Sequence, residues 1–321
     1  MNILGELQRQ LYEGQITEEN FYKKYYYYRK KEEKKWYSNL SISKRMQLHR
    51  FILPIFKIKN RLAGFSYEIV DNKSCMKLNK PIIFAITHVG KFDIEVLSEA
   101  IKEHYFLLTG DFEHIQGTIY APFLGINGVI YFNEKIKDER VSVSDRMIEI
   151  LKNGGNLMYF PEGAWNLSPN LPVLPCYWGI IDVAKKSNAV IIPIAACQYG
   201  KHFKINIGNN IEGDTFEEGV NGKAIAIEII RNTLASLSWE IYESGGIFNR
   251  TSIDVDEWEK YKVLRFKEWT YFNISYVDDL VYKPKGITSP QKVISDMENI
   301  QPNINNSFLF DKRNSGLWKN Y

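Results

Sequence analysis

The sequence predicts an α/β protein, with a mixed, largely parallel sheet, helices on both faces, and a basic N-terminal helical segment in front. Two observations predict this class. Short apolar runs such as 82–86, bounded by turn residues, alternate with stretches of helical spacing such as 92–103. Strands that alternate with helices are joined by crossover connections, which build parallel sheets with helices on both sides.

The body of the domain is expected to begin near Gly64. We expect its strands at 65–70, 82–86, 105–109, 128–132, 156–160, 189–196 and 203–207, and its helices at 92–103, 141–151, 178–186 and 222–242, with a short apolar helix or turn at 120–125. The predicted division is a basic amphipathic helical segment at 1–63, an α/β domain at 64–249 and a C-terminal extension of unknown role at 250–321.

Positive charge is concentrated at the N-terminus. Residues 1–61 carry 14 basic side chains against 6 acidic ones, whereas the whole chain has a net charge of only +3. Within 43–63 the cations alternate with bulky apolar residues, so this segment could lie in a membrane interface or pack its apolar side into the core. No nucleic-acid-reading module accompanies it, and the expected partner is therefore a membrane surface and not a nucleic acid.

Cysteine and histidine usage argues against a disulfide framework and against a metal site. The three cysteines, Cys75, Cys176 and Cys197, form no C-x-x-C pair, and the five histidines are scattered. The N-terminus lacks the apolar core of a signal peptide, and no apolar run has the length needed to span a bilayer. We expect a cytoplasmic protein that lies peripherally on the inner face of the membrane.

The loop after 82–86 contains a candidate general base. His88 and Asp93 flank four residues, and Asp93 stands where the next helix should begin. Its carboxylate could turn back to the imidazole, fix the tautomer and leave the other ring nitrogen free to accept a proton from a substrate hydroxyl or amine. The plainer alternative is that Asp93 only caps the helix.

A second loop should lie at the same edge of the sheet. The strand at 156–160 runs into Pro161, Glu162 and Gly163. Glycine would let the backbone approach a ligand, and Glu162 would add a carboxylate near His88. Proline and glycine are also ordinary turn residues, so this loop carries weight mainly through its pairing with the first.

Together these segments resemble the glycerophosphate and lysophospholipid acyltransferase family. Its four blocks appear here in order, as His88 to Asp93 (H-x-x-x-x-D), Gly128 to Glu134, Phe160 to Gly163 (F-P-E-G) and Val190 to Ile194. The resemblance implies a glycerol-3-phosphate acyltransferase-like fold and catalytic roles for His88 and Asp93. It also implies an acyl-CoA or acyl-carrier-protein donor, a lipid acceptor, and oxyanion donors among the backbone amides near Gly90 or Gly163.

Two positions depart from the family pattern. Glu134 and Trp165 stand where members that bind phosphate acceptors have arginine, the usual fork for a phosphate. Lys91, or Lys135 and Lys137 just beyond Glu134, could take over such a contact, and Trp165 could stack on an acceptor ring or the acyl chain. The expected substrate-binding residues are Lys91, Glu134, Phe160, Pro161, Glu162, Gly163 and Trp165.

Three other functions stay open at this point. One is transfer to a sugar, an amino lipid or a polysaccharide intermediate, which the two missing arginines would favour. Another is a lipid-binding relative that has no catalytic activity. A hydrolase is disfavoured, because the chain has no G-x-S-x-G nucleophile elbow.

Overall fold

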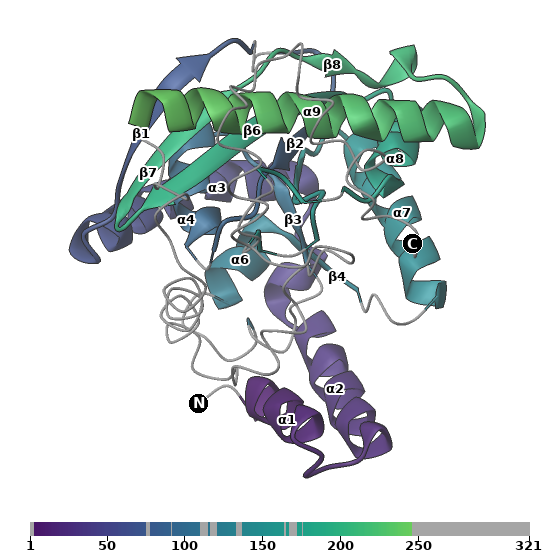
Figure 1. Cartoon of the computed structure of the whole chain (residues 1–321). Coiled ribbons are helices and arrows are strands. Elements are labelled where there is room, and N and C mark those ends of the chain that lie inside the picture. Colours follow the sequence, from purple (N-terminus) through teal and green to yellow (C-terminus); the bar gives the residue numbers. More distant parts are fainter. Residues whose placement is uncertain are drawn as a thin grey trace, which may run out of the picture.

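The computed structural model describes residues 3–74, 78–90, 92–109, 115, 121–132, 137–163, 165–166, 172–174 and 176–245. An eight-stranded sheet crosses its centre (Figure 1). The strands are β1 (Ser66–Asn72), β2 (Ile82–Ile86), β3 (Phe106–Thr109), β4 (Val129–Tyr131), β5 (Leu157–Tyr159), β6 (Val190–Tyr199), β7 (His202–Ile207) and β8 (Ile211–Glu212). Their order is β1-β7-β6-β2-β5-β3-β4, and β8 pairs with β6.

Parallel pairing dominates the sheet, which confirms the predicted class. Strand β2 pairs in parallel with both β5 and β6, and β3 does so with β4 and β5. The antiparallel pairs involve β6 with β7 and with β8, so the sheet is mixed. The loops that contain His88 and Glu162 follow β2 and β5, respectively, and these strands are neighbours in the sheet. Their carboxyl ends therefore meet at one edge, where open α/β sheets place ligands.

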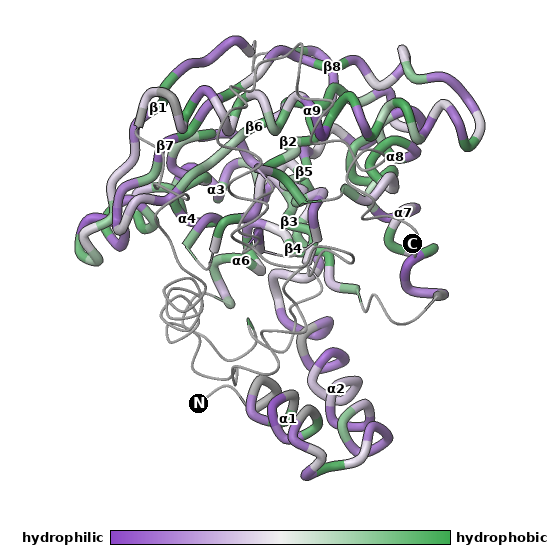
Figure 2. The backbone as a smooth tube through the Cα atoms, viewed as in Figure 1, coloured by the Kyte–Doolittle hydropathy of each residue, from purple (hydrophilic) through white to green (hydrophobic). Residues whose placement is uncertain are grey.

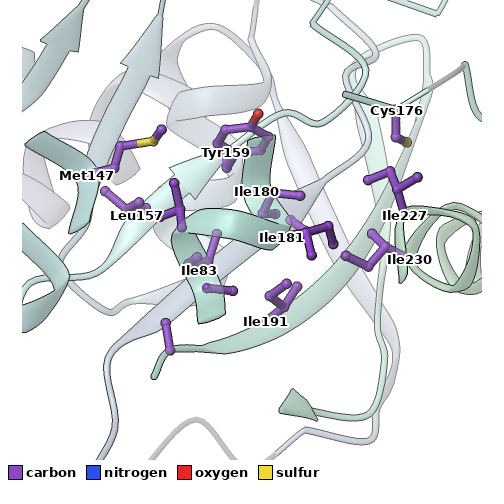
Figure 3. Close-up of a cluster of buried hydrophobic side chains, with 14 of the residues drawn as sticks. Ile83, Met147, Leu157, Tyr159, Cys176, Ile180, Ile181, Ile191, Ile227 and Ile230 are labelled. Atoms are coloured by element: carbon purple, nitrogen blue, oxygen red, sulfur yellow. The ribbon is translucent and has the colours of Figure 1, made fainter. Parts of the chain in front are cut away.

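Helices cover both faces of the sheet, as predicted. One face carries α3 (Ile42–Leu62), α4 (Asp93–Ile101) and α6 (Ala121–Asn127), and the other carries α7 (Lys137–Lys152), α8 (Gly179–Ser187) and α9 (Gly219–Gly245). Short 3-10 helices lie at η1 (Trp36–Asn39) and η2 (Gly213–Thr215). A hydrophobic core lies between the sheet and each layer of helices. Figure 3 shows part of the core on the side of α7, α8 and α9, where Ile83 and Ile191 of the sheet meet Ile180 and Ile181 of α8 and Ile230 of α9.

Strand β2 lies between the two cores. All five of its residues are buried, and alternate side chains contribute to opposite faces of the sheet. A strand covered on both sides has no solvent face, so its sequence is a continuous apolar run without alternation. Figure 2 shows this contrast between the hydrophobic strands at the centre and the largely hydrophilic α2.

The N-terminal helices α1 (Ile3–Tyr12) and α2 (Glu18–Glu33) project from the body (Figure 1). They pack on each other around Leu7, Phe21 and Tyr25. On α2, Arg29 ties the pair to the domain, since it contacts Glu139 of α7 at 2.6 Å and donates to the carbonyl of Tyr131 at 3.2 Å. Within the predicted helical segment at 1–63, the chain turns between α1 and α2 with Gly14 at a positive φ.

Helix α3 has two different faces. Its inner face packs on α4 and α6 through Ile52 and Phe56, so α3 belongs to the same core as the strands. The expected boundary at residue 63 therefore does not divide two separate hydrophobic cores, because α3 packs into the core of the α/β domain. Its outer face exposes Phe51, Ile55, Ile58 and Leu62, which follow one another at helical spacing.

Two cations of α3 serve the fold. Arg45 is buried and donates to backbone carbonyls of Tyr37, Gly125 and Ile126. Lys59 forms an ion pair with Glu95 at the start of α4. The expectation that the basic residues of this segment act together at a membrane is therefore wrong for these two, whereas Lys44, Arg50, Lys57 and Arg61 remain exposed.

A buried polar cluster fixes the N-terminal half of α3 to α6. His49 contacts the Asn127 side-chain oxygen through Nδ1 at 2.6 Å, and His104 contacts the Asn127 carbonyl through Nε2 at 2.7 Å. Asn127 in turn donates to the carbonyl of Tyr105. Burial lowers the pKa of both histidines; for His104, burial together with the neighbouring charges of His49 and Arg45 lowers the pKa to about 4.

We expect the free energy of unfolding to fall as the pH is lowered from about 6.5 to about 4. In this window the unfolded chain protonates His104 and the native protein does not, which lowers stability by up to about 3 kcal/mol. Urea unfolding at several pH values measures the effect. A His104→Gln variant should lose most of this pH dependence, and an unchanged slope in that variant would contradict the assignment.

Other regions bear on the remaining expectations. No helix within the described residues has the length and apolar character needed to cross a membrane. Strand β8 and η2 were not predicted, because two or three residues carry no periodic signal. The expected extension at 250–321 lies outside the described residues.

Candidate active site

The first site loop starts from a fixed point on the sheet. Thr87, the first residue after β2, donates its backbone N–H to the carbonyl of Ile194 at 3.1 Å. Its hydroxyl accepts from the backbone N–H of Ala196 at 2.9 Å. Because Thr87 is buried and bound to β6 in both ways, the next residue, His88, leaves the sheet in a defined direction.

His88 and Asp93 are in contact across the loop. The imidazole Nδ1 lies 2.8 Å from Asp93 Oδ2, and the same oxygen accepts the backbone N–H groups of Val89 at 2.8 Å and Gly90 at 3.1 Å. The carboxylate is fully buried and faces back toward the loop. Phe92, not Asp93, occupies the N-cap position of α4. Asp93 therefore organises the loop around His88, and the plainer alternative of a helix cap does not describe its contacts.

This contact settles which imidazole nitrogen can act as a base. A carboxylate accepts, so Nδ1 carries the proton and Nε2 keeps its lone pair. The His88 side chain is 20% exposed, so part of the imidazole meets solvent. The pair can take a proton from a hydroxyl group through Nε2 while Asp93 stabilises the imidazolium that forms.

Two aromatic rings flank the imidazole. Phe160, at the end of β5, is stacked on it with a centroid distance of 4.2 Å and an interplanar angle of 22°. Trp165 stands nearly perpendicular to it at 6.0 Å. The second loop therefore brings an apolar wall and an indole ring to the base.

Within the second loop, Glu162 and Gly163 face different ways. Glu162 is buried, and its carboxylate accepts backbone N–H groups of His88 and Leu174. Gly163 is exposed and adopts a φ of +66°, which favours glycine. A Cβ on Gly163 would lie 2.6 Å from the ring of Tyr177. The tight approach of this ring is a second reason for glycine there.

The structure brings together most of the residues predicted for the site: His88, Asp93, Phe160, Pro161, Glu162, Gly163 and Trp165. Lys91 and Glu134 lie outside the described residues. The expected oxyanion donors are already engaged, because Gly90 donates to Asp93 and the N–H of Gly163 donates to the carbonyl of Phe160. That expectation is not supported by these contacts.

Sequence reasoning missed Thr87 and Tyr177. The Thr87 hydroxyl follows an apolar strand directly, and this placement was a usable signal. Tyr177 donates its backbone N–H to the carbonyl of Pro161 at 2.8 Å and covers Gly163 with its ring. It is 14 residues from Gly163 in the chain, and no spacing rule connects the two.

Among the described residues, no group of three or more His, Cys, Asp or Glu side chains is arranged to hold a metal ion. The described thiols, Cys176 and Cys197, are buried and are not joined in a disulfide.

Comparison with known proteins identifies the domain. Residues 68–196, which run from β1 into β6 and include both site loops, match the model of the family described as Acyltransferase. This part of the chain is therefore similar to acyltransferase domains. The predicted family resemblance is thereby confirmed.

A curated relative of the acyltransferase domain is the 1-acyl-sn-glycerol-3-phosphate acyltransferase of Saccharomyces cerevisiae, which is 22% identical over 144 residues. The match covers 43% of this chain and 45% of the yeast protein, so the chain spans less than half the length of that relative. Among solved structures, the chain aligns with the 1-acyl-sn-glycerophosphate (LPA) acyltransferase PlsC from Thermotoga maritima. It has a TM-score of 0.47 and 15% identity, over 60% of this chain and 81% of that one.

Proposed function

We propose that this protein is an O-acyltransferase. It moves a fatty acyl group from an acyl thioester to a hydroxyl group of a lysophospholipid-like acceptor, with His88 and Asp93 as its catalytic pair. The contact between His88 Nδ1 and the buried Asp93 carboxylate carries this proposal, because it leaves Nε2 as an accessible base. The acyltransferase family match supports it independently.

The transfer proceeds directly between the two substrates. As the acceptor oxygen attacks the thioester carbonyl carbon, His88 Nε2 takes the hydroxyl proton and a C–O bond forms. The tetrahedral intermediate then collapses, the C–S bond breaks, and the leaving thiolate takes the proton back from His88. Asp93 holds the imidazole and stabilises its charged form between the two proton transfers. No acyl-enzyme intermediate forms.

The donor carries the acyl group as a thioester, either acyl-CoA or an acyl-acyl-carrier protein, and no further cofactor takes part. Both donors deliver the same reacting carbon, and they differ in the carrier that the protein surface must accept. A rate comparison with the same acyl chain on each carrier distinguishes them.

Trp165 bears on the acceptor. The yeast relative is named for a phosphate-containing acceptor, but here an indole stands beside the base where phosphate-binding members of the resembled family have arginine. Indole offers a flat apolar face and a single N–H, in contrast to the charged fork of arginine. We propose an acceptor whose group next to the reacting hydroxyl is not a simple phosphomonoester, which includes sugar-containing and amino lipids.

An acceptor panel tests this proposal. The protein is assayed with lysophosphatidic acid, a lysophospholipid with a larger headgroup and a lysoglycolipid, each with the wild type, Trp165→Ala and Trp165→Phe. We expect lysophosphatidic acid to be the poorest acceptor, and we expect alanine to raise KM for the best acceptor about tenfold while phenylalanine keeps most of the affinity. Robust acylation of lysophosphatidic acid, together with a harmless Trp165→Ala, would overturn it.

We also propose that the outer face of α3 holds the protein on the inner leaflet of the cytoplasmic membrane. Phe51, Ile58 and Leu62 are 73%, 59% and 85% exposed, and the exposed cations Arg50 and Lys57 lie on the same helix. The 21 residues of α3 include no acidic side chain. Exposed apolar groups among cations match an anionic lipid interface. The inner face of the helix contacts α4, whose first residue is Asp93, so this placement would bring lipid near the base.

Vesicle sedimentation measures this docking. An Ile58→Ser, Leu62→Ser variant should bind vesicles containing anionic lipid at least about tenfold more weakly than the wild type, because it exposes less apolar surface to the interface. Ile225→Ser, on the exposed face of α9, is the matched control and should bind like the wild type. Equal binding by all three proteins would show that α3 does not form the lipid contact.

A further inference from the structure

The carboxylate of Glu162 is committed to the protein backbone. Its side chain is buried, Oε1 accepts the backbone N–H of His88 at 2.9 Å, and Oε2 accepts the backbone N–H of Leu174 at 2.6 Å. Both oxygens therefore point into the protein. A group so placed does not present a carboxylate to an acceptor, contrary to the substrate-binding role expected from the sequence.

The second loop holds the main chain of His88 on both sides. Glu162 accepts from the N–H of His88, and the backbone N–H of Asn166 donates to the carbonyl of His88 at 2.8 Å. Asp93 separately holds the imidazole. The loop after β2 supplies the base, and the loop after β5 determines where the backbone of that base sits.

We infer that Glu162 is a positioning residue for the proposed acyl transfer: it fixes the backbone of His88, and thereby the aim of Nε2, and it does not bind the acceptor. This inference rests on the proposed function. Transfer depends steeply on the position of the base, since a displacement of about 1 Å costs on the order of a hundredfold in rate. The tie to Leu174 also anchors the loop to the segment that leads into α8.

The surroundings of Glu162 favour its neutral form. Burial, with a smaller contribution from the nearby charge of Asp93 on α4, raises the pKa of its carboxyl to about 8. The N–H groups of Leu174 and His88 and the charge of Arg231 on α9 oppose this rise. The ionised carboxylate accepts from both N–H groups, whereas protonation turns one oxygen into a donor. The tie is therefore strongest at alkaline pH.

The Glu162→Gln variant tests the inference. Its amide keeps the shape and one acceptor, but its NH₂ group faces a second N–H. We expect kcat to fall about 10- to 100-fold while KM for donor and acceptor stays within about threefold. Glu212→Gln, at an exposed ion pair with Lys80, is the matched control and should keep wild-type kinetics. A tenfold rise in acceptor KM at unchanged kcat, or no change at all, would overturn the inference.

The wild-type protein gives a second readout that needs no variant to fold. Its kcat should rise with pH through about 8 at constant acceptor KM, and a KM that changes while kcat stays flat would overturn the inference. Different results would refute the proposed function and the role of Glu162. A wild-type protein without transfer activity refutes the proposed function, whereas an active wild type with a fully active Glu162→Gln variant refutes only the role of Glu162.

Discussion

Replacing His88 by alanine should reduce kcat for acyl transfer by roughly 10²- to 10⁴-fold, the range expected when a positioned general base is lost. Nε2 is the accessible basic atom that the Asp93 contact creates, and alanine leaves nothing in its place. KM should change little, because the imidazole acts on the reacting proton and contributes little to ground-state binding. Steady-state assays with a saturating acyl thioester measure both constants.

His202→Ala is the matched control for this variant. His202 is partly exposed on β7, where it contacts Ser66, and its loss should leave the rate unchanged. Undiminished transfer by His88→Ala would contradict the general-base role. If both the wild type and His88→Ala bound the acyl donor and the lipid but neither showed turnover, the chain would instead be a non-catalytic lipid-binding relative.

Asp93→Asn should damage both activity and stability. The wild-type carboxylate accepts three N–H groups through one buried oxygen. An amide that places its oxygen at the position of Oδ2 keeps these contacts without the negative charge and buries its NH₂ group at the position of Oδ1, which has no hydrogen-bond partner among the described residues. The flipped amide turns its NH₂ group toward the three N–H donors. We expect the free energy of unfolding to fall by about 2–4 kcal/mol and kcat to fall by roughly 10²- to 10⁴-fold, since no carboxylate remains to stabilise the imidazolium of His88.

Chemical denaturation and kinetics on the same Asp93→Asn preparation separate the two effects. The control is Asp182→Asn on α8, which removes a partly exposed partner of Lys223 on α9. It should lower the free energy of unfolding by at most about 1 kcal/mol and leave the activity unchanged. A fully stable and fully active Asp93→Asn protein would show that the carboxylate neither organises the loop nor orients the base.

The sequence predicted the structure around the loop after β2 well because its signals are local. Strand β2 has the bounds expected from its apolar run, and α4 begins at Asp93, one residue later than expected. The alternation of strands and helices predicts that both loops lie at the same edge of the sheet. The pairing of β2 with β5, which the sequence did not predict, places them next to each other.

Tertiary contacts determined what the sequence did not predict. The sequence does not distinguish a glutamate that binds the protein interior from one that faces a ligand. Glu162 was therefore expected to face a substrate, whereas in the structure it accepts the backbone N–H groups of His88 and Leu174. Likewise, the spacing of the basic residues along α3 does not show which of them are buried and which are exposed. Only packing shows that Arg45 binds carbonyls in the core while Arg50 meets solvent.

The most direct test of the account is product analysis with purified wild-type protein, a labelled long-chain acyl thioester and a total lipid extract. The account predicts a new labelled lipid whose mass equals an acceptor with one hydroxyl esterified, and no label on the protein itself. Its mass would also name the acceptor. Label that passes only to free fatty acid, or that stays covalently bound to the protein, with both acyl-CoA and acyl-acyl-carrier protein as donors, would contradict direct transfer by His88.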